Sequence, residues 1–209
     1  GRCEVSLRPF TVGQQEDPSQ AMNAKGPGQS VLLLVDVIDI LKHLHIPYAI
    51  IGAVAASFHG VVRASLDADA LISLTSSRMD AKRLIAELRK AGLKSRYRTG
   101  DVDDPVGAVI TAEDRFRNRV DLLMNIQGMS EAVFSRTIEA KFMDARLCVI
   151  GMEDFIAMKI FAGSQKDVSD IVGVLKVSRD RMNLSLLKKL VQRYGLDALR
   201  KLESLLQER

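Results

Sequence analysis

Apolar residues near the start of the chain recur with two different spacings. Between residues 30 and 45 they follow one another at three- and four-residue steps, which predicts an amphipathic helix with Ser30 as its N-cap. The next apolar run, Tyr48-Ala-Ile-Ile-Gly52, is short and ends in a glycine, which favours a strand and a turn. The small residues at 53–57 then predict a helix packed closely on a sheet.

A second strand is expected from Leu66 to Leu74, where polar and apolar residues alternate. Asp67 and Asp69 are the polar members of its first half. Because successive side chains of a strand point to opposite faces, both carboxylates are expected on one face, with about 6 to 7 Å between their Cα atoms.

The rest of the chain predicts further strands and then only helices. A helix is expected at 77–91, and the strands that follow are expected at 106–111, 119–124 and 147–150. The middle strand of these three carries Asp121, and the last one is expected to close the sheet. The later helices are expected at 153–162, 167–177, 184–194 and 196–206.

These elements predict one core with two appendages. The core occupies residues 30–150 and combines strands with helices, and residues 151–209 form a C-terminal helical subdomain. Residues 1–29 contain three of the five prolines and little periodicity, so we expect a loosely held arm.

Composition and charge narrow the function classes only slightly. The 209 residues are 47% hydrophobic, which is enough for one sizeable core. The formal net charge of +4 arises from 30 basic and 26 acidic residues that are interspersed. This surplus is too small to identify a nucleic-acid-binding protein, but it permits a polyanionic ligand.

The cysteines and the hydropathy pattern bear on the cellular compartment. Cys3 and Cys148 lie far apart and lack His or Cys neighbours at ligand spacing, which argues against a disulfide framework and against a structural zinc site. No apolar run approaches the roughly 20 residues that span a bilayer, and no secretory leader is recognisable. We therefore expect a soluble, cytoplasmic protein without a membrane partner.

The paired aspartates are the main candidate for chemistry. Two carboxylates at this range repel each other, so they require a counter-charge, which Mg²⁺ or Arg63 can supply. With Asp121 as a third ligand, one or two Mg²⁺ ions could activate an attacking hydroxyl and stabilise a leaving pyrophosphate. The alternative is that Asp67 and Asp69 simply form the solvated edge of a strand.

The order of these features resembles the nucleotidyltransferase superfamily, in particular its minimal and abortive-infection-toxin types. The matching segments are Ile51-Gly-Ala-Val-Ala-Ala-Ser-Phe-His-Gly-Val-Val-Arg-Ala-Ser-Leu-Asp-Ala-Asp69, Arg119-Val-Asp-Leu-Leu123, Glu153-Asp-Phe-Ile-Ala-Met-Lys159 and Lys166-Asp-Val-Ser-Asp-Ile171. The resemblance implies an α+β nucleotidyltransferase fold, in which a mixed β-sheet is flanked by helices and followed by a helical subdomain.

The resemblance also implies roles for individual residues. Asp67, Asp69 and Asp121 would be catalytic and would bind Mg²⁺, with Asp121 as a candidate base. The nucleotide-binding residues would be Gly52, Ala53, Ser57, Arg63, Ser65 and Lys159. The sequence departs from the family pattern at three positions, since Ala53 replaces a glycine, Ser65 a threonine and Ser164 a basic residue.

Several of these residues have competing interpretations. Arg63 either bridges the aspartates or a phosphate, or lies at the surface. Asp167 and Asp170 either orient Lys159 or act as a base, and Asp167 also suits a helix N-cap. The arginines at 96, 98, 115, 117 and 119 either line a groove for RNA or nucleotide, or keep a sheet edge soluble.

The resulting hypothesis is Mg²⁺-dependent transfer of a nucleotidyl group from a nucleoside triphosphate, such as ATP, to an unknown acceptor. RNA, a protein or a small molecule are candidate acceptors. The alternative is a catalytically degenerate binding module, or one half of a toxin–antitoxin pair. In the latter case, an antitoxin-type protein would be a partner. A third interpretation is a structural partner of a toxin, with the C-terminal helices at 184–206 as the docking surface. The apolar stripe of these helices is more often simple core, and it consists of Leu186, Leu187, Leu190, Val191 and Leu199.

Overall fold

The computed structural model of the protein describes residues 22–75, 77, 79–101 and 104–207. Within these residues the chain forms a seven-stranded sheet with the order β3-β4-β5-β2-β1-β7-β6. The strands are β1 (Tyr48–Ile51), β2 (Asp67–Ile72), β3 (Lys94–Thr99), β4 (Val106–Glu113), β5 (Arg119–Ile126), β6 (Ile138–Phe142) and β7 (Ala145–Val149). β2 runs parallel to β5 and β1 parallel to β7, whereas the other neighbours are antiparallel. The predicted mixed sheet and α+β class are confirmed.

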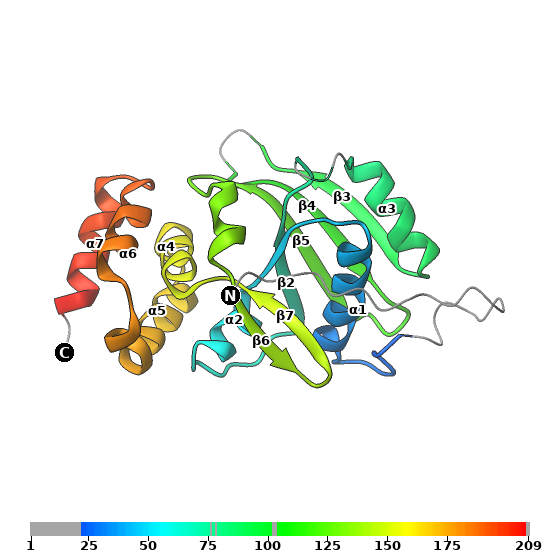
Figure 1. Ribbon diagram of the computed structural model, residues 1–209, viewed down its shortest axis with the longest axis horizontal. Helices are drawn as coiled ribbons and strands as arrows, with labels where there is room; N and C mark the ends of the chain where they lie inside the picture. The colour runs from blue at the N-terminus through cyan, green and yellow to red at the C-terminus, as the bar shows by residue number, and fades with distance from the viewer. Residues whose placement is uncertain (1–21, 76, 78, 102–103, 208–209) are drawn as a thin grey trace.

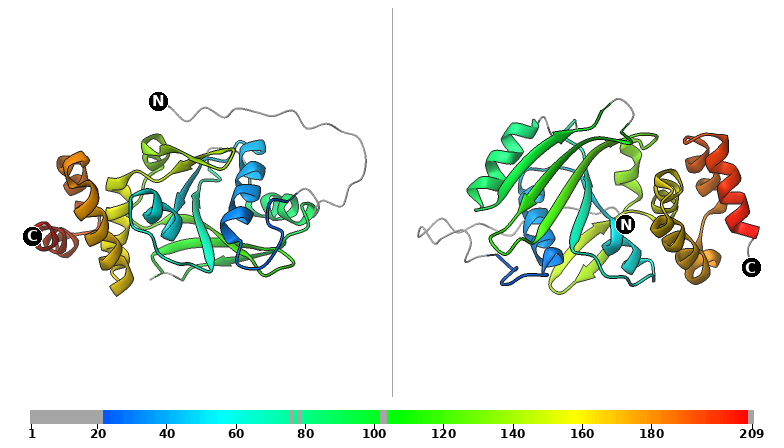
Figure 2. Two further views of the ribbon diagram at one scale, coloured as in Figure 1. Left: turned by 90° about the horizontal axis from the view of Figure 1, so that it is seen from below. Right: turned by 180° about the vertical axis from the view of Figure 1, so that it is seen from behind.

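Two helices cover one face of the sheet. α1 (Ser30–His43) packs on β2 and β5, and α3 (Ala81–Lys90) packs on β3 and β4 (Figure 1). Fully buried residues of the central strands, such as Ala70, Ile110 and Leu122, lie beneath these helices. In the view from behind in Figure 2, β3, β4 and β5 lie in front of α1, and none of the described helices crosses that opposite face.

The elements after residue 150 form a helical group at one end of the molecule (Figure 1). Its helices are α4 (Met152–Ala162), α5 (Gln165–Ser178), η3 (Arg179–Arg181), α6 (Leu184–Gln192) and α7 (Leu196–Gln207). The stripe considered as a docking surface packs inward, because Leu187, Leu190 and Val191 are buried. The other short elements are α2 (Gly52–Phe58), which follows β1 directly, and η2 (Glu131–Arg136).

Two strands are missing from the sequence prediction. β3 and β6 are the edges of the sheet, and most of their side chains are exposed or only partly buried. β3 lacks the apolar alternation by which strands are recognised, whereas the short β6 has it at Ile138, Ala140 and Phe142, where the prediction overlooked it. β7 therefore does not close the sheet as predicted, since β6 lies outside it.

The helix starts also differ from the predictions. Ser30 is not an N-cap, because Gln29 holds that position and the Ser30 hydroxyl donates to the carbonyl of Leu66 at 2.5 Å. α3 begins after Asp80, whose carboxylate accepts from the Arg83 N–H at 2.7 Å, rather than at Ser77.

Residues at the start of the described chain lie against the core. Ala24 is buried, the Asn23 amide nitrogen donates to Asp36 at 2.6 Å, and the Gln29 N–H donates to Asn118 at 2.7 Å. The rest of the predicted arm, residues 1–21, lies outside the described residues.

The sequence argument against a disulfide framework is wrong for Cys148 on β7, which is disulfide-bonded. Cys3 lies outside the described residues. No helix among the described residues is long and apolar enough to cross a membrane.

Candidate active site

The three candidate aspartates lie on adjacent strands. Asp67 and Asp69 are partly exposed on β2, while Ala68 and Ala70 between and after them are fully buried, which confirms that both carboxylates share one face. β5 is the parallel neighbour of β2, and Asp121 is the direct register partner of Asp69. The three carboxylates therefore lie on the sheet face that α1 and α3 leave open.

Gly52 brings the end of β1 against the same carboxylates. Its φ of +66° lies in the left-handed region, and a Cβ built on this residue would overlap Oδ2 of Asp69. A glycine is needed here for both reasons. Ile51, the preceding residue, is the register partner of Asp69 on β1, so Asp69 lies between the β1–α2 junction and Asp121.

The surroundings of Asp69 raise the pKa of its carboxyl group strongly. Burial raises its pKa to about 6, and the nearby charges of Asp67 and Asp121 add to the increase, while Lys159 and Arg119 oppose it. A carboxylate that is costly to ionise beside two others provides a favourable place for a cation. Hard divalent cations such as Mg²⁺ prefer oxygen ligands of this kind, so the donor set fits the expected metal.

The carboxylate of Asp121 is held by two neighbours that sequence reasoning did not assign to it. It accepts a hydrogen bond from the Thr111 hydroxyl at 2.7 Å and two from Arg119, at 3.1 Å from Nε and 2.6 Å from Nη2. These bonds raise the pKa of Arg119. As the side chains lie, no three His, Cys, Asp or Glu residues in the described part of the chain are gathered closely enough to hold a metal. Metal binding by all three aspartates therefore requires their side chains to move closer together.

The two cations expected at the phosphates belong to a buried ionic cluster. Lys159 on α4 is 7% exposed, and its Nζ lies 2.6 Å from Oδ1 of Asp167 and 2.9 Å from Oδ2 of Asp170. Arg63, in the loop before β2, reaches the same Asp170 with Nε at 3.1 Å. Arg63 thus bridges to Asp170 and not to Asp67 or Asp69. The interpretation that Asp167 and Asp170 orient Lys159 agrees with these distances.

Asp167 is not the N-cap of α5. Ser164 is the N-cap, and Asp167 completes a capping box three residues later, with Oδ2 accepting from the Ser164 hydroxyl at 2.6 Å. Burial alone would raise the pKa of Asp167, but the hydrogen bonds from Lys159 and Ser164 outweigh it and lower the pKa. Ser164, which stands where the resemblance implies a basic residue, therefore has a structural function.

The remaining predicted nucleotide-binding residues lie close to the aspartates in the chain but differ in accessibility. Ser65 donates its hydroxyl to Oδ1 of Asp67 at 3.1 Å. Ala53 is buried at the start of α2, and the exposed Ser57 donates its hydroxyl to the Ala53 carbonyl at 3.1 Å. Ser57 is accessible to a ligand, whereas Ala53 can offer only its backbone.

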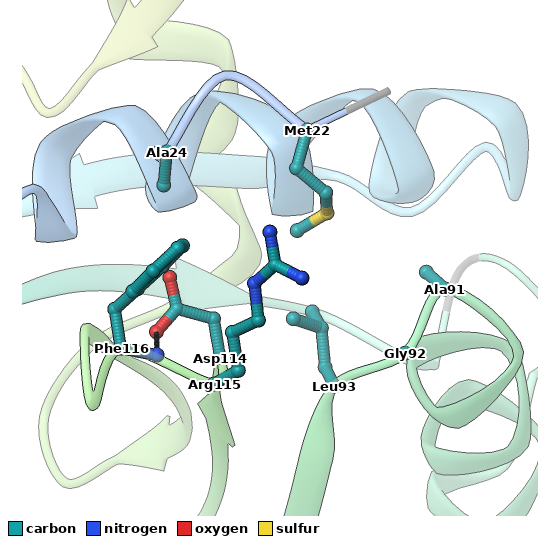
Figure 3. A pocket seen from close by; sticks show the side chains of 8 residues that line it. All are labelled: Met22, Ala24, Ala91, Gly92, Leu93, Asp114, Arg115 and Phe116. Carbon is teal, nitrogen blue, oxygen red and sulfur yellow. Dashed lines mark hydrogen bonds between the residues drawn. The ribbon is translucent and has the colours of Figure 1, made fainter. Parts of the chain in front are cut away.

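Arg115 does not join the open face. It lies in a cavity of about 180 Å³ between the start of the described chain, the α3–β3 turn and the β4–β5 turn (Figure 3). Its guanidinium lies 4.8 Å from the centre of the Phe116 ring. In the close-up the side chain points toward Met22. Arg115 is therefore separated from Arg96 and Arg98 on β3 and from Arg119 on β5, which were expected to line one groove with it.

The sequence matches no family model and no curated protein, but the fold resembles solved structures. The crystal structure of ANT(2″)-Ia in complex with adenylyl-2″-tobramycin has a TM-score of 0.56 and 14% identity, with coverage of 80% of this chain and 99% of that one. The solution structure of ANT(2″)-Ia has a TM-score of 0.50 and 13% identity, with coverage of 86% and 95%. An antigenic nucleotidyltransferase-like protein from Paracoccidioides brasiliensis has a TM-score of 0.48 and 15% identity, with coverage of 89% and 96%. At these identities the similarity shows the fold alone, which is that of the nucleotidyltransferases.

Proposed function

We propose that this protein is a Mg²⁺-dependent nucleotidyltransferase that moves a nucleotidyl group from a nucleoside triphosphate to an acceptor hydroxyl. The observation that supports this most is the position of Asp69, which lies between Gly52 and Asp121 with its pKa raised to about 6. Asp67, Asp69 and Asp121 would hold the metal. Bound Mg²⁺ would neutralise charge on the phosphates of the triphosphate.

The residues have distinct roles in the proposed reaction. The acceptor oxygen attacks the α-phosphorus, the bond from that phosphorus to the bridging oxygen of the β-phosphate breaks, and pyrophosphate leaves. Asp121 accepts the proton of the acceptor hydroxyl, and Arg119, which donates to Asp121 through two nitrogens, orients its carboxylate. Gly52 leaves the space that the Asp69 carboxylate occupies.

The test is transfer of label from each α-³²P-labelled nucleoside triphosphate in the presence of Mg²⁺. Total RNA, cell extract and tobramycin serve as acceptors, the last because a fold neighbour was solved with adenylyl-2″-tobramycin. The natural protein should transfer label and the Asp67→Asn, Asp69→Asn double variant should not. The Asp197→Asn, Glu203→Gln variant removes two exposed carboxylates of α7 and should keep full activity. Equal transfer by all three proteins would refute the assignment.

A second candidate function is a binding module that keeps the fold without transferring a nucleotide. It is favoured by the buried ionic cluster, in which Lys159 and Arg63 are already neutralised by Asp167 and Asp170. It predicts that Mg²⁺ with ATP or CTP leaves the melting temperature unchanged. Nucleotide binding at a hundred times its Kd would instead add about 2.7 kcal/mol to the free energy of unfolding.

A further inference from the structure

The open sheet face extends from the aspartates to a basic edge strand. The register pairs Asp69 with Asp121, Asp121 with Thr111, and Thr111 with Arg96. Residues paired directly across a sheet have side chains on the same face, so Arg96 faces the same side as the aspartates. Three strand spacings separate Arg96 from Asp69, which is roughly 14 Å.

A second row runs beside the first. It pairs Asp67 with Arg119, Arg119 with Glu113, and Glu113 with Lys94. Arg98 continues the basic side of β3, so three cations at alternate positions project on this face over roughly 14 Å along the strand. We call Lys94, Arg96 and Arg98 the β3 cations.

The β3 cations are exposed, and two of them have no ion pair with a carboxylate of the described residues. Arg98 pairs with Asp104 at 3.1 Å, whereas neither Lys94 nor Arg96 has an ion pair with any residue the structure describes. Glu113 is the acidic residue within this face near Lys94, and it is partly buried. β3 and β4 have no helix over this face in Figure 2, so a ligand can approach it.

We infer that this face binds a phosphate-bearing acceptor, a single-stranded RNA, whose backbone lies along the β3 cations while its reacting hydroxyl reaches the aspartates. This inference rests on the proposed function and names the acceptor. The cations extend over a distance greater than one phosphate group, which favours a chain of nucleotides over a mononucleotide. The aspartates repel phosphates and the β3 cations attract them. These charges therefore orient the RNA, with its backbone along β3 and its reacting hydroxyl toward the aspartates.

The first experiment measures binding without any chemistry. A fluorescein-labelled 12-nucleotide single-stranded RNA is titrated with protein at several KCl concentrations, without nucleoside triphosphate. The Lys94→Ala, Arg96→Ala variant should raise the Kd at least tenfold, and should reduce the slope of log Kd against log salt by about 1.4, because each phosphate contact on a single strand contributes about 0.7. The Lys82→Ala, Arg83→Ala variant removes equal charge from exposed positions of α3, on the covered side, and should bind as the natural protein does.

The second experiment measures label transfer by the same three proteins to the RNA and to cytidine 5′-phosphate. If only the Lys94→Ala, Arg96→Ala variant loses RNA binding and none of the three proteins transfers label, the proposed function is refuted, and the inference that this face binds RNA stands. Transfer to RNA that is equal in the natural and Lys94→Ala, Arg96→Ala proteins would refute this inference and keep the enzyme. No RNA binding by the natural protein, or transfer to cytidine 5′-phosphate alone, would also overturn the inference.

Discussion

Gly52 and Asp69 occupy adjoining space so closely that a single methyl group on Gly52 would overlap Oδ2 of Asp69. Gly52 begins α2 directly after β1, and Ile51, the last residue of β1, lies opposite Asp69 on the antiparallel strand β2. The position of the Asp69 carboxylate thus depends on the absence of a side chain at Gly52.

Gly52→Ala should therefore remove Mg²⁺ and nucleotide binding as well as destabilise the protein. The substitution adds strain at φ +66° and displaces Asp69. Gly92→Ala is the matched control, because its φ is +81° but nothing lies within 4 Å of the added Cβ. Each variant should lose about 1 kcal/mol from backbone strain, and only Gly52→Ala should lose ligand binding in a calorimetric titration. Normal binding by Gly52→Ala would contradict the close packing.

Asp69→Asn should stabilise the metal-free protein at neutral pH. Because the native pKa of about 6 exceeds the ordinary value of 3.8, the folded state loses stability as pH rises through this window, and the cost is fully present above pH 6. Removing the charge should add about 1 to 3 kcal/mol to the free energy of unfolding at pH 7.5, and nothing near pH 3.5. Urea unfolding at both pH values measures this.

Asp104→Asn is a control in which the opposite change in stability is expected at neutral pH. The hydrogen bond from the Val106 N–H, followed by that from Arg98, lowers the pKa of Asp104, so its charge stabilises the fold at neutral pH and this contribution is lost on acidification. Asp104→Asn should destabilise the protein at pH 7.5. If both variants lose stability there, Asp69 is not electrostatically strained.

Added Mg²⁺ should reverse the order of stability of the Asp69→Asn variant and the natural protein. A cation that binds the ionised carboxylates stabilises the folded natural protein in proportion to the logarithm of its concentration, and it has no such effect once the central carboxylate is removed. Melting curves from 0.1 to 20 mM MgCl₂ test this. An equal Mg²⁺-dependent shift in both proteins would place the metal elsewhere.

Arg119→Gln should raise the pKa of Asp69 above 6. The positive charge of Arg119 currently opposes the increase caused by burial and by the other two aspartates. Titration of the side-chain carboxyl ¹³C resonance by NMR measures the change. Arg98→Gln is the control, because Arg98 does not contribute to the shift at Asp69. An unchanged Asp69 pKa in Arg119→Gln would show that the two side chains are not electrostatically coupled.

Asp170→Asn should destabilise the protein by about 3 kcal/mol, because it leaves the buried Lys159 and the half-buried Arg63 short of a counter-charge. Asp197→Asn breaks the exposed ion pair with Arg200 and should change the free energy of unfolding by less than about 0.5 kcal/mol. Chemical denaturation of both variants measures the difference. Equal effects would mean that the cluster around Asp170 is solvated.

The sequence was sufficient to predict the shared face of Asp67 and Asp69, since strand alternation is a local property. It could not predict that β5 is the parallel neighbour of β2, because that pairing joins segments about fifty residues apart and depends on the whole sheet. The link from Arg63 to Asp170 also joins distant segments, and no local pattern indicates it. β3 was missed because only Ser95 in it is buried, so it lacks the apolar signal of an inner strand.

The two edge strands of the sheet have a further consequence for the protein at high concentration. Among the described residues, β3 and β6 are the outer strands, and an exposed edge can pair with the edge of another molecule. Lys94, Arg96 and Arg98 on one edge, and Glu139 and Lys141 on the other, make such pairing unfavourable. Replacing the charges of β3 to abolish ligand binding would therefore also remove a barrier to self-association, so a loss of solubility is expected to accompany the loss of affinity.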